Sequence, residues 1–238
     1  SDYIAVNFVD RVFENPTMFT GFENLVALFG YSLQVYADFS GYTDIAIGTA
    51  MLMGFYLPKN FDSPYKATNP GGFWKRWHIS LSSWFKDYLY IPLGGNKKGK
   101  LRKKINLFIV FLVSGIWHGA SWTFVLWGIA HGVARIIEDC CPKLLAKIPL
   151  FIRRVFTLIF IVFAFVIFRA TSIGQAAGIF SQMFTFSNLG LDNFNRLLTN
   201  GVFGVPNFAA IAIAFAAIAI CFVIILKEKS TAQLIDSM

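Results

Sequence analysis

Residues 105–134 form a run of thirty positions without Asp, Glu, Lys or Arg, and this run restricts the possible folds most strongly. About twenty consecutive apolar residues suffice for a helix to cross the hydrocarbon core of a bilayer. The run therefore predicts a membrane segment, which either crosses once with a tilt or forms a tight hairpin. The whole chain agrees, because 14% of its residues are charged whereas soluble domains have about 25%. We expect an all-α, polytopic transmembrane protein.

A second apolar stretch precedes this run. From 24 to 58 the formally charged residues are Asp38 and Asp44. The stretch is too long for one straight crossing at about 1.5 Å per residue, and its glycines provide places to bend. We therefore predict short or broken membrane helices that meet near the two aspartates. The rest of the prediction is a single membrane domain over residues 1–238, with further spans at 149–169 and 205–226.

Lys and Arg are concentrated between the predicted spans. Residues 59–104 contain eleven of the 21 Lys and Arg and two acids, as is typical of a cytoplasmic loop that contacts anionic lipid headgroups. This uneven distribution argues against nucleic acid as the reason for the net charge of +8. Within the loop, a repeat of three or four predicts an interfacial amphipathic helix over about 72–90. Its apolar stripe consists of Phe73, Trp77, Leu81, Trp84 and Tyr88.

His118 is the first candidate for chemistry because it lies inside the uncharged run. A helix that continues unbroken from Lys104 places it about 14 residues, or ~21 Å, past the cytoplasmic edge. Hydrocarbon offers no partners to a polar ring, so ionisable residues in such segments are treated as functional. A buried, uncharged imidazole can act as the base that removes an alcohol proton during acyl transfer. The alternative is a packing histidine bonded to a backbone carbonyl of a neighbouring helix.

The basic loop contributes a second group of candidates. His78 is placed to orient a thioester donor or to assist His118, although the residues alone favour an interfacial histidine among basic neighbours. Lys75, Arg76 and Lys86 are candidates for contacts with the phosphates of a donor. Anchoring to lipid headgroups is the stronger expectation for these three cations.

The apolar segments contain weaker candidates. Asp38 and Asp44 are embedded carboxylates, which rarely face lipid. The alternatives for these two residues are to line a polar tunnel, to pair with cations of the basic loop or to tie helices together through hydrogen bonds. The last, structural role is favoured over a catalytic one. Trp117 is expected to form a wall of the site rather than to donate its indole N–H, and His131 is expected to be structural. The spacing of His and Cys predicts no metal site.

Three segments carry a family resemblance, and they are Tyr36–Gly48, Phe73–Leu81 with Trp77 and His78, and Ser114–Gly119 with His118. In this order they resemble the membrane-bound O-acyltransferases. The resemblance is strongest to the bacterial branch with the alginate O-acetyltransferase membrane proteins and the D-alanyl transfer protein of teichoic acid modification. It implies that this chain is the C-terminal part of a longer fold and that N-terminal helices are missing from it.

The resemblance also implies an activity. The chain would be an O-acyltransferase with His118 as its essential histidine and His78 as the second histidine of the family. No cofactor is expected to be bound. The donor is an acyl thioester on the cytoplasmic side, either acetyl-CoA or the phosphopantetheine of an acyl carrier. The acyl group, most simply acetyl, moves to an exported polysaccharide or an extracytoplasmic partner protein, across a bacterial inner membrane that the chain spans several times.

Two other functions are compatible with the residues. In a transporter or flippase component, Asp38, Asp44 and the histidines would line a translocation path. In a scaffold without chemistry of its own, the chain would dock an extracytoplasmic acyltransferase. Replacement of His118 separates these alternatives, because loss of the ring would abolish acyl transfer only in the enzyme.

Overall fold

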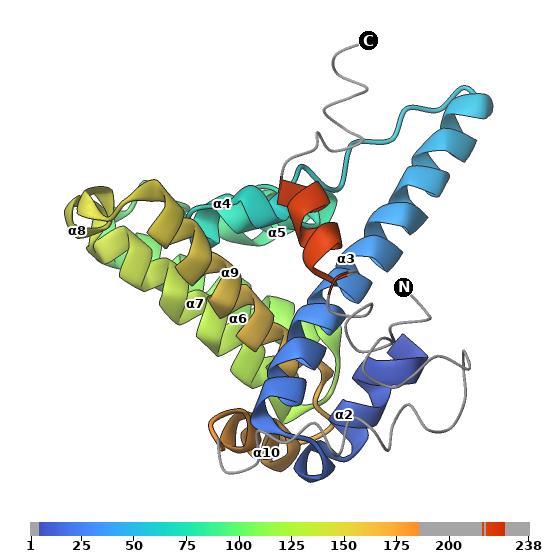
Figure 1. The fold of residues 1–238 in the computed structure, drawn as a ribbon. Helices are drawn as coiled ribbons and strands as arrows, with labels where there is room; N and C mark the ends of the chain where they lie inside the picture. The colour runs from blue at the N-terminus through green and yellow to red at the C-terminus, as the bar shows by residue number, and fades with distance from the viewer. Residues whose placement is uncertain (1–4, 186–215, 217, 227–238) are drawn as a thin grey trace. The chain divides into compact units, whose positions relative to one another are not determined.

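The computed structural model describes residues 5–185, 216 and 218–226. Every regular element in these ranges is helical (Figure 1), which confirms the all-α prediction for the described part of the chain. The chain divides into two compact units, residues 1–39 with 169–227 and residues 40–168 with 228–238. The predicted span at 205–226 lies mostly outside the described residues. Within it, residues 216 and 218–226 are described, and they are helical.

The first unit gathers short helical elements around the start of a long helix. These are a π-helical turn at Ala5–Val9, α2 at Asp10–Glu14, a 3-10 turn at Pro16–Met18, the first part of α3 at Gly21–Leu52, and α10 at Ile173–Met183. A capping box begins α3: the Thr20 N–H donates to Glu23 Oε2 at 2.6 Å, and the Glu23 N–H donates to Thr20 Oγ1 at 3.3 Å. These bonds satisfy backbone donors that a helix start leaves open.

Helix α3 corrects the prediction of broken helices over 24–58. The structure has one continuous helix of 32 residues, Gly21–Leu52, which passes through both Asp38 and Asp44. Glycine lowers helix propensity but keeps its backbone N–H, so Gly41 and Gly48 preserve the hydrogen-bond ladder that a proline would interrupt. After Leu52 the chain turns at Gly54, which has a φ of 82°.

The basic loop corrects the prediction of one amphipathic helix over about 72–90. Three short elements replace it: α4 at Pro70–Trp74, α5 at Ile79–Phe85 and a π-helical turn at Lys86–Tyr90. The interruption centres on His78, whose backbone is left-handed with a φ of 45°. The predicted stripe is divided accordingly, because Phe73 and Trp77 are buried whereas Trp84 and Tyr88 are exposed.

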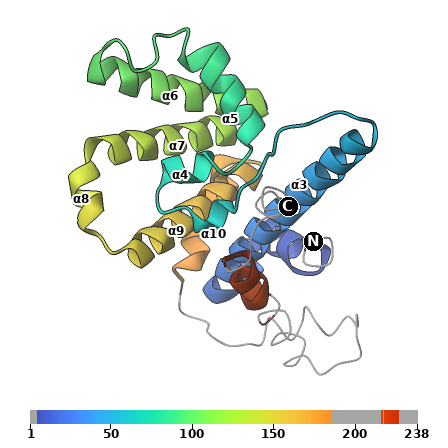
Figure 2. The same ribbon diagram turned by 90° about the horizontal axis from the view of Figure 1, so that it is seen from above.

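The uncharged run at 105–134 forms the helical hairpin that the sequence left open. Helix α6 spans Gly99–His118, a short link follows, and α7 spans Trp122–Cys140; the two lie side by side (Figures 1 and 2). Their backbones approach closely at two glycines. A methyl group on Gly115 would overlap the carbonyl oxygen of Phe124, and one on Gly128 would overlap that of Phe111. Small residues at such contacts allow tight packing of helices.

Helices α8 at Pro142–Lys147 and α9 at Leu150–Arg169 follow the hairpin. Among the described helices, α9 is the one whose length and apolar composition suffice to cross a membrane, and it coincides with the span predicted at 149–169. Two phenylalanines of α9 contact the rest of the second unit: Phe165 lies 5.4 Å from the Trp77 ring and Phe160 lies 5.1 Å from His131.

Candidate active site

His78 is held at the junction between α4 and α5 by Asn60. The ring nitrogen Nδ1 of His78 lies 3.1 Å from Asn60 Oδ1. The same oxygen accepts hydrogen bonds from the Ser80 backbone N–H at 3.2 Å and the Ser80 hydroxyl at 2.9 Å. The backbone oxygen of Asn60 accepts from the Ile79 N–H at 3.0 Å. Asn60 therefore fixes both the left-handed backbone of His78 and its ring.

The surroundings of His78 favour its uncharged form. Burial is the main reason why its pKa falls to about 4, and the nearby ring of His118 adds to this decrease. A second positive charge close to an imidazolium is unfavourable, and a partly buried site screens it less than water does. His78 is consequently uncharged at neutral pH. Trp77, which precedes His78, contacts Phe165 of α9 at 5.4 Å, and His118 contacts Phe168 of the same helix at 5.0 Å, so the two histidine motifs pack against the same part of α9.

His118 is the last residue of α6, in a half-buried position surrounded by aromatic rings. Its ring centroid lies 5.0 Å from Phe168, 5.3 Å from Trp127 and 6.2 Å from Phe124. The helix is unbroken from Gly99 to His118, as the estimate of depth requires. The ring therefore combines an apolar enclosure with partial access.

Trp117 and His131 occupy different positions around this cluster. The Trp117 ring meets the His118 ring at 5.1 Å and 73°, but the side chain is 59% exposed, so it borders the site on an outer side. His131 is fully buried, and its Nδ1 accepts a hydrogen bond from Trp74 Nε1 at 3.1 Å. Those contacts fit the structural role predicted for His131.

A cavity of about 430 Å³ lies beside the hairpin, within the size range of small-molecule sites. Its lining combines apolar and hydroxyl side chains with cations: Gly71, Trp74, Lys75, Ile79, Leu81, Ser82, Ser83, Phe85, Lys86, Tyr90, Lys103, Leu107, Val110, Phe111, Ser114 and Arg135. Neither candidate histidine lines it, but Ile79 follows His78 directly and Ser114 lies one helical turn before His118. The cavity is thus lined by chain neighbours of both histidines without including either of them.

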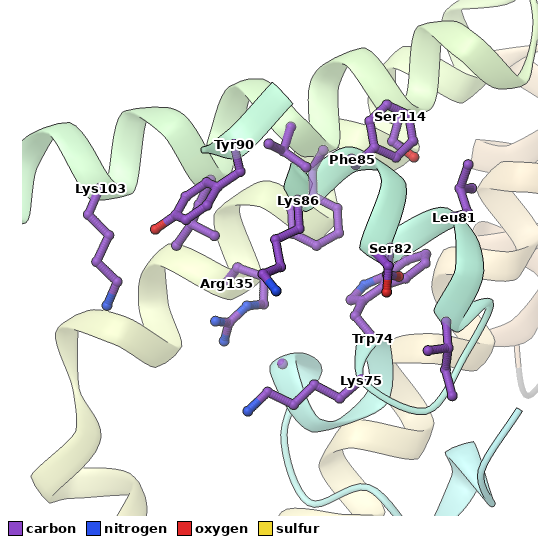
Figure 3. A pocket seen from close by; sticks show the side chains of 16 residues that line it. Trp74, Lys75, Leu81, Ser82, Phe85, Lys86, Tyr90, Lys103, Ser114 and Arg135 are labelled. Carbon is purple, nitrogen blue, oxygen red and sulfur yellow. The ribbon is translucent and has the colours of Figure 1, made fainter. Parts of the chain in front are cut away.

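The cationic groups gather at one end of the cavity. Figure 3 shows the amino groups of Lys75 and Lys86 and the guanidinium of Arg135 extending into one region, with Ser114 and Leu81 at the other side. Arg135 forms an ion pair with Glu138, which also accepts a hydrogen bond from the Gly71 N–H at 2.8 Å.

Two of the cavity's cations are thus less compensated than the others. Lys103 pairs with Asp139, as Arg135 does with Glu138. Lys86 has a looser contact with Asp87 at 3.9 Å, and both of those side chains are largely exposed. Lys75 is also exposed. Lys75 and Lys86 are therefore the cavity cations most available to an added anion.

The lining of the cavity does not include Arg76, Asp38 or Asp44. Arg76, next to Lys75 in sequence, donates to the backbone oxygen of Asp62 at 3.0 Å and lies 3.7 Å from its carboxylate, so it holds the loop together. Asp38 and Asp44 are exposed on α3 and do not line the cavity. Their role at a tunnel stays a prediction.

The sequence did not predict Asn60, Lys103 or Arg135 at the site. Asn60 is 18 residues from His78, and the contact depends on a left-handed residue that periodicity does not reveal. Lys103 and Arg135 line the same cavity because an antiparallel hairpin brings the start of α6 next to the end of α7. If the sequence had predicted that hairpin, it would also have predicted that Lys103 and Arg135 lie on the same side of it.

Comparison with known proteins gives a consistent result. The sequence profile of the membrane-bound O-acyltransferase family (MBOAT) matches residues 3–175. The chain is 41% identical over 226 residues to the probable alginate O-acetylase AlgI of Pseudomonas putida, with 92% of this chain and 44% of that protein covered. It is 40% identical over 196 residues to the peptidoglycan O-acetyltransferase of Helicobacter pylori, with 81% and 37% covered.

A more distant match is the teichoic acid D-alanyltransferase of Bacillus subtilis. The identity is 37% over 117 residues, which cover 46% of this chain and 30% of that protein. The chain spans less than half the length of the relatives it matches.

Proposed function

Because the chain belongs to the membrane-bound O-acyltransferase family, we propose that the protein moves an acyl group from a cytoplasmic thioester to hydroxyls of an exported polysaccharide or to an extracytoplasmic partner protein. The acyl group is most simply acetyl, as the names of two relatives suggest for their own reactions. The membrane is the bacterial inner membrane, crossed several times. One observation carries the proposal: two histidine motifs pack against the same part of α9, through Trp77 and His118, and chain neighbours of both histidines line a cavity that contains basic groups.

The cavity suits the donor. Acetyl-CoA and the phosphopantetheine of an acyl carrier both combine phosphate with a flexible, less polar arm that ends in the thioester. Lys75 and Lys86 are the proposed phosphate contacts, since amino groups bind phosphate through charge-assisted hydrogen bonds. The arm would extend along the apolar lining past Phe85 and Ser114, in the direction of His118.

His118 is the proposed base. Its ring nitrogen accepts the proton of the acceptor hydroxyl while the hydroxyl oxygen attacks the carbonyl carbon of the thioester. The carbon–sulfur bond then breaks, and the proton held by His118 passes to the leaving thiolate. The ring is uncharged again after each turnover, and no external acid or base is consumed. His78 assists from its place beside His118, and Trp117 borders the site.

Replacement of the two lysines tests the donor site. We expect Lys75→Ala and Lys86→Ala each to raise the KM for the thioester donor roughly three- to tenfold, which corresponds to about 1 kcal/mol of phosphate binding. The turnover number should change less, because the phosphates are remote from the reacting carbonyl. The measurement is the initial rate of acyl transfer against donor concentration in membranes that contain the full-length variant.

Lys97→Ala is the matched control, since Lys97 lies in the same basic loop and is exposed outside the cavity. If the cavity lysines only anchor the loop to lipid headgroups, all three variants will have the same donor KM as the wild type. That result would remove the cavity from the proposed donor site.

A further inference from the structure

The contacts of Asn60 identify the proton positions around His78. A backbone N–H is always a donor, and the Ser80 N–H points to the side-chain atom Oδ1 of Asn60 at 3.2 Å. This contact fixes the orientation of the Asn60 amide. If the amide were rotated by half a turn, its NH2 group would face the Ser80 N–H, and two donors would point at each other. The atom that faces His78 Nδ1 at 3.1 Å is therefore an oxygen.

An amide oxygen has no proton to give, so Nδ1 of His78 must carry one. In an uncharged imidazole with a proton on Nδ1, the lone pair is on Nε2, at the opposite edge of the ring. The contact thus selects one of the two uncharged tautomers. It also orients the ring, because Asn60 is itself buried, with 8% of its surface exposed, and is bonded to α5 through both its side chain and its backbone.

We propose that Asn60 is a positioning residue of the acyl-transfer site, which holds His78 in the Nδ1–H tautomer and leaves the lone pair of the uncharged ring on Nε2. This inference rests on the proposed function. Its consequence for the reaction is electrostatic: an uncharged His78 allows the proton taken up by His118 to be the added positive charge at the site, without a second imidazolium beside it.

The Asn60→Asp variant separates positioning from folding. A carboxylate keeps an oxygen acceptor at the same place but stabilises the imidazolium, so the pKa of His78 rises from about 4. His118 is a titratable group that acts on His78 in the wild type, and it remains in the variant together with both partners of the neighbouring Arg76–Asp62 pair. His78 then stays protonated to higher pH, and the acidic limb of the rate–pH profile should move upward by one pH unit or more.

Asn69→Asp is the matched control. It places the same charge in the same loop, but Asn69 caps α4 by accepting a hydrogen bond from the Gly72 N–H, and aspartate caps helices equally well. We expect its profile to coincide with that of the wild type. Asn60→Ala, which removes the acceptor, should lower the turnover number tenfold or more with little change in the donor KM.

The outcomes distinguish this inference from the proposed function. If the wild-type protein transfers the acyl group, His118→Ala does not, and Asn60→Asp has the wild-type profile, Asn60 has no positioning role. If the wild type shows no transfer, the proposed function itself fails. An activity-independent readout covers variants that fold poorly: 15N NMR of histidine-labelled full-length protein, with the His78 signal assigned through His78→Gln. The Nδ1–H tautomer is expected at neutral pH, and the Nε2–H tautomer would overturn the inference.

Discussion

Cells that express the full-length protein with His118→Ala are expected to lose polysaccharide O-acylation almost entirely. General base catalysis contributes about 10²- to 10⁴-fold to a rate. Removal of the base therefore slows acyl transfer so much that few esters form on the polymer. His118→Gln should have the same effect, although it retains a polar side chain of similar size. The measurement is the ester content of the purified polymer, with the amount of protein in the membrane determined in parallel.

The result also separates the enzyme from its alternatives. A scaffold that docks another acyltransferase predicts normal ester content in the His118→Ala cells whenever the partner still binds. A transporter component predicts altered transport and no acyl transfer by the wild type. His131→Ala provides a contrast among the histidines, because it leaves the Trp74 indole N–H without its acceptor and opens a cavity. We expect that variant to lower protein abundance first, whereas His118→Ala lowers activity at normal abundance.

Among the glycines whose surroundings the structure describes, Gly115→Ala should produce the largest structural effect of a single methyl addition. The added carbon would overlap the carbonyl oxygen of Phe124, a backbone atom that no side-chain rotation can move away. Helices α6 and α7 must separate, at a cost of about 1–3 kcal/mol for an overpacked contact. The apparent melting temperature should fall by roughly 2–10 °C, and transfer per folded molecule should fall as well, because His118 ends the same helix one turn later.

The control for this variant is Gly178→Ala in α10, where an added methyl meets nothing within 4 Å. Alanine has the higher helix propensity, so its stability should equal or exceed that of the wild type. A melting temperature for Gly115→Ala that matches the Gly178→Ala protein would show that the hairpin does not depend on close backbone contact. Thermal unfolding in detergent, followed by the loss of soluble monomer, provides the comparison.

The sequence predicted the helical class better than it predicted the local structure. His78 and His118 were both chosen from short motifs, and their roles in the site stay predictions; the structure packs Trp77 and His118 against the same part of α9. The helix expected over 72–90 was wrong because a repeat of apolar residues cannot reveal a left-handed residue at His78, which long-range bonds to Asn60 stabilise. The broken helices expected over 24–58 were wrong because glycines permit a bend without causing one.

Charge patterns had a similar limit. The concentration of Lys and Arg predicted a basic cytoplasmic loop, and the structure places several of its cations at the cavity, but adjacent residues took different roles. Lys75 lines the cavity, whereas Arg76 is committed to Asp62. Lys103 and Arg135 are 32 positions apart and reach the same cavity only through the antiparallel packing of α6 and α7. Contacts of this kind follow from tertiary packing, which spacing along the chain does not specify.

The most direct test of the proposed catalysis uses inside-out membrane vesicles that contain the full-length protein together with its polymer and partner proteins. Isotopically labelled acetyl-CoA, or acetylated acyl carrier in a parallel sample, is added to the exposed cytoplasmic face, and label in ester linkage to the polymer or partner is measured. We predict label transfer with the wild type and background levels with His118→Ala at equal protein content. Label transfer at the wild-type rate in the His118→Ala vesicles would contradict the account.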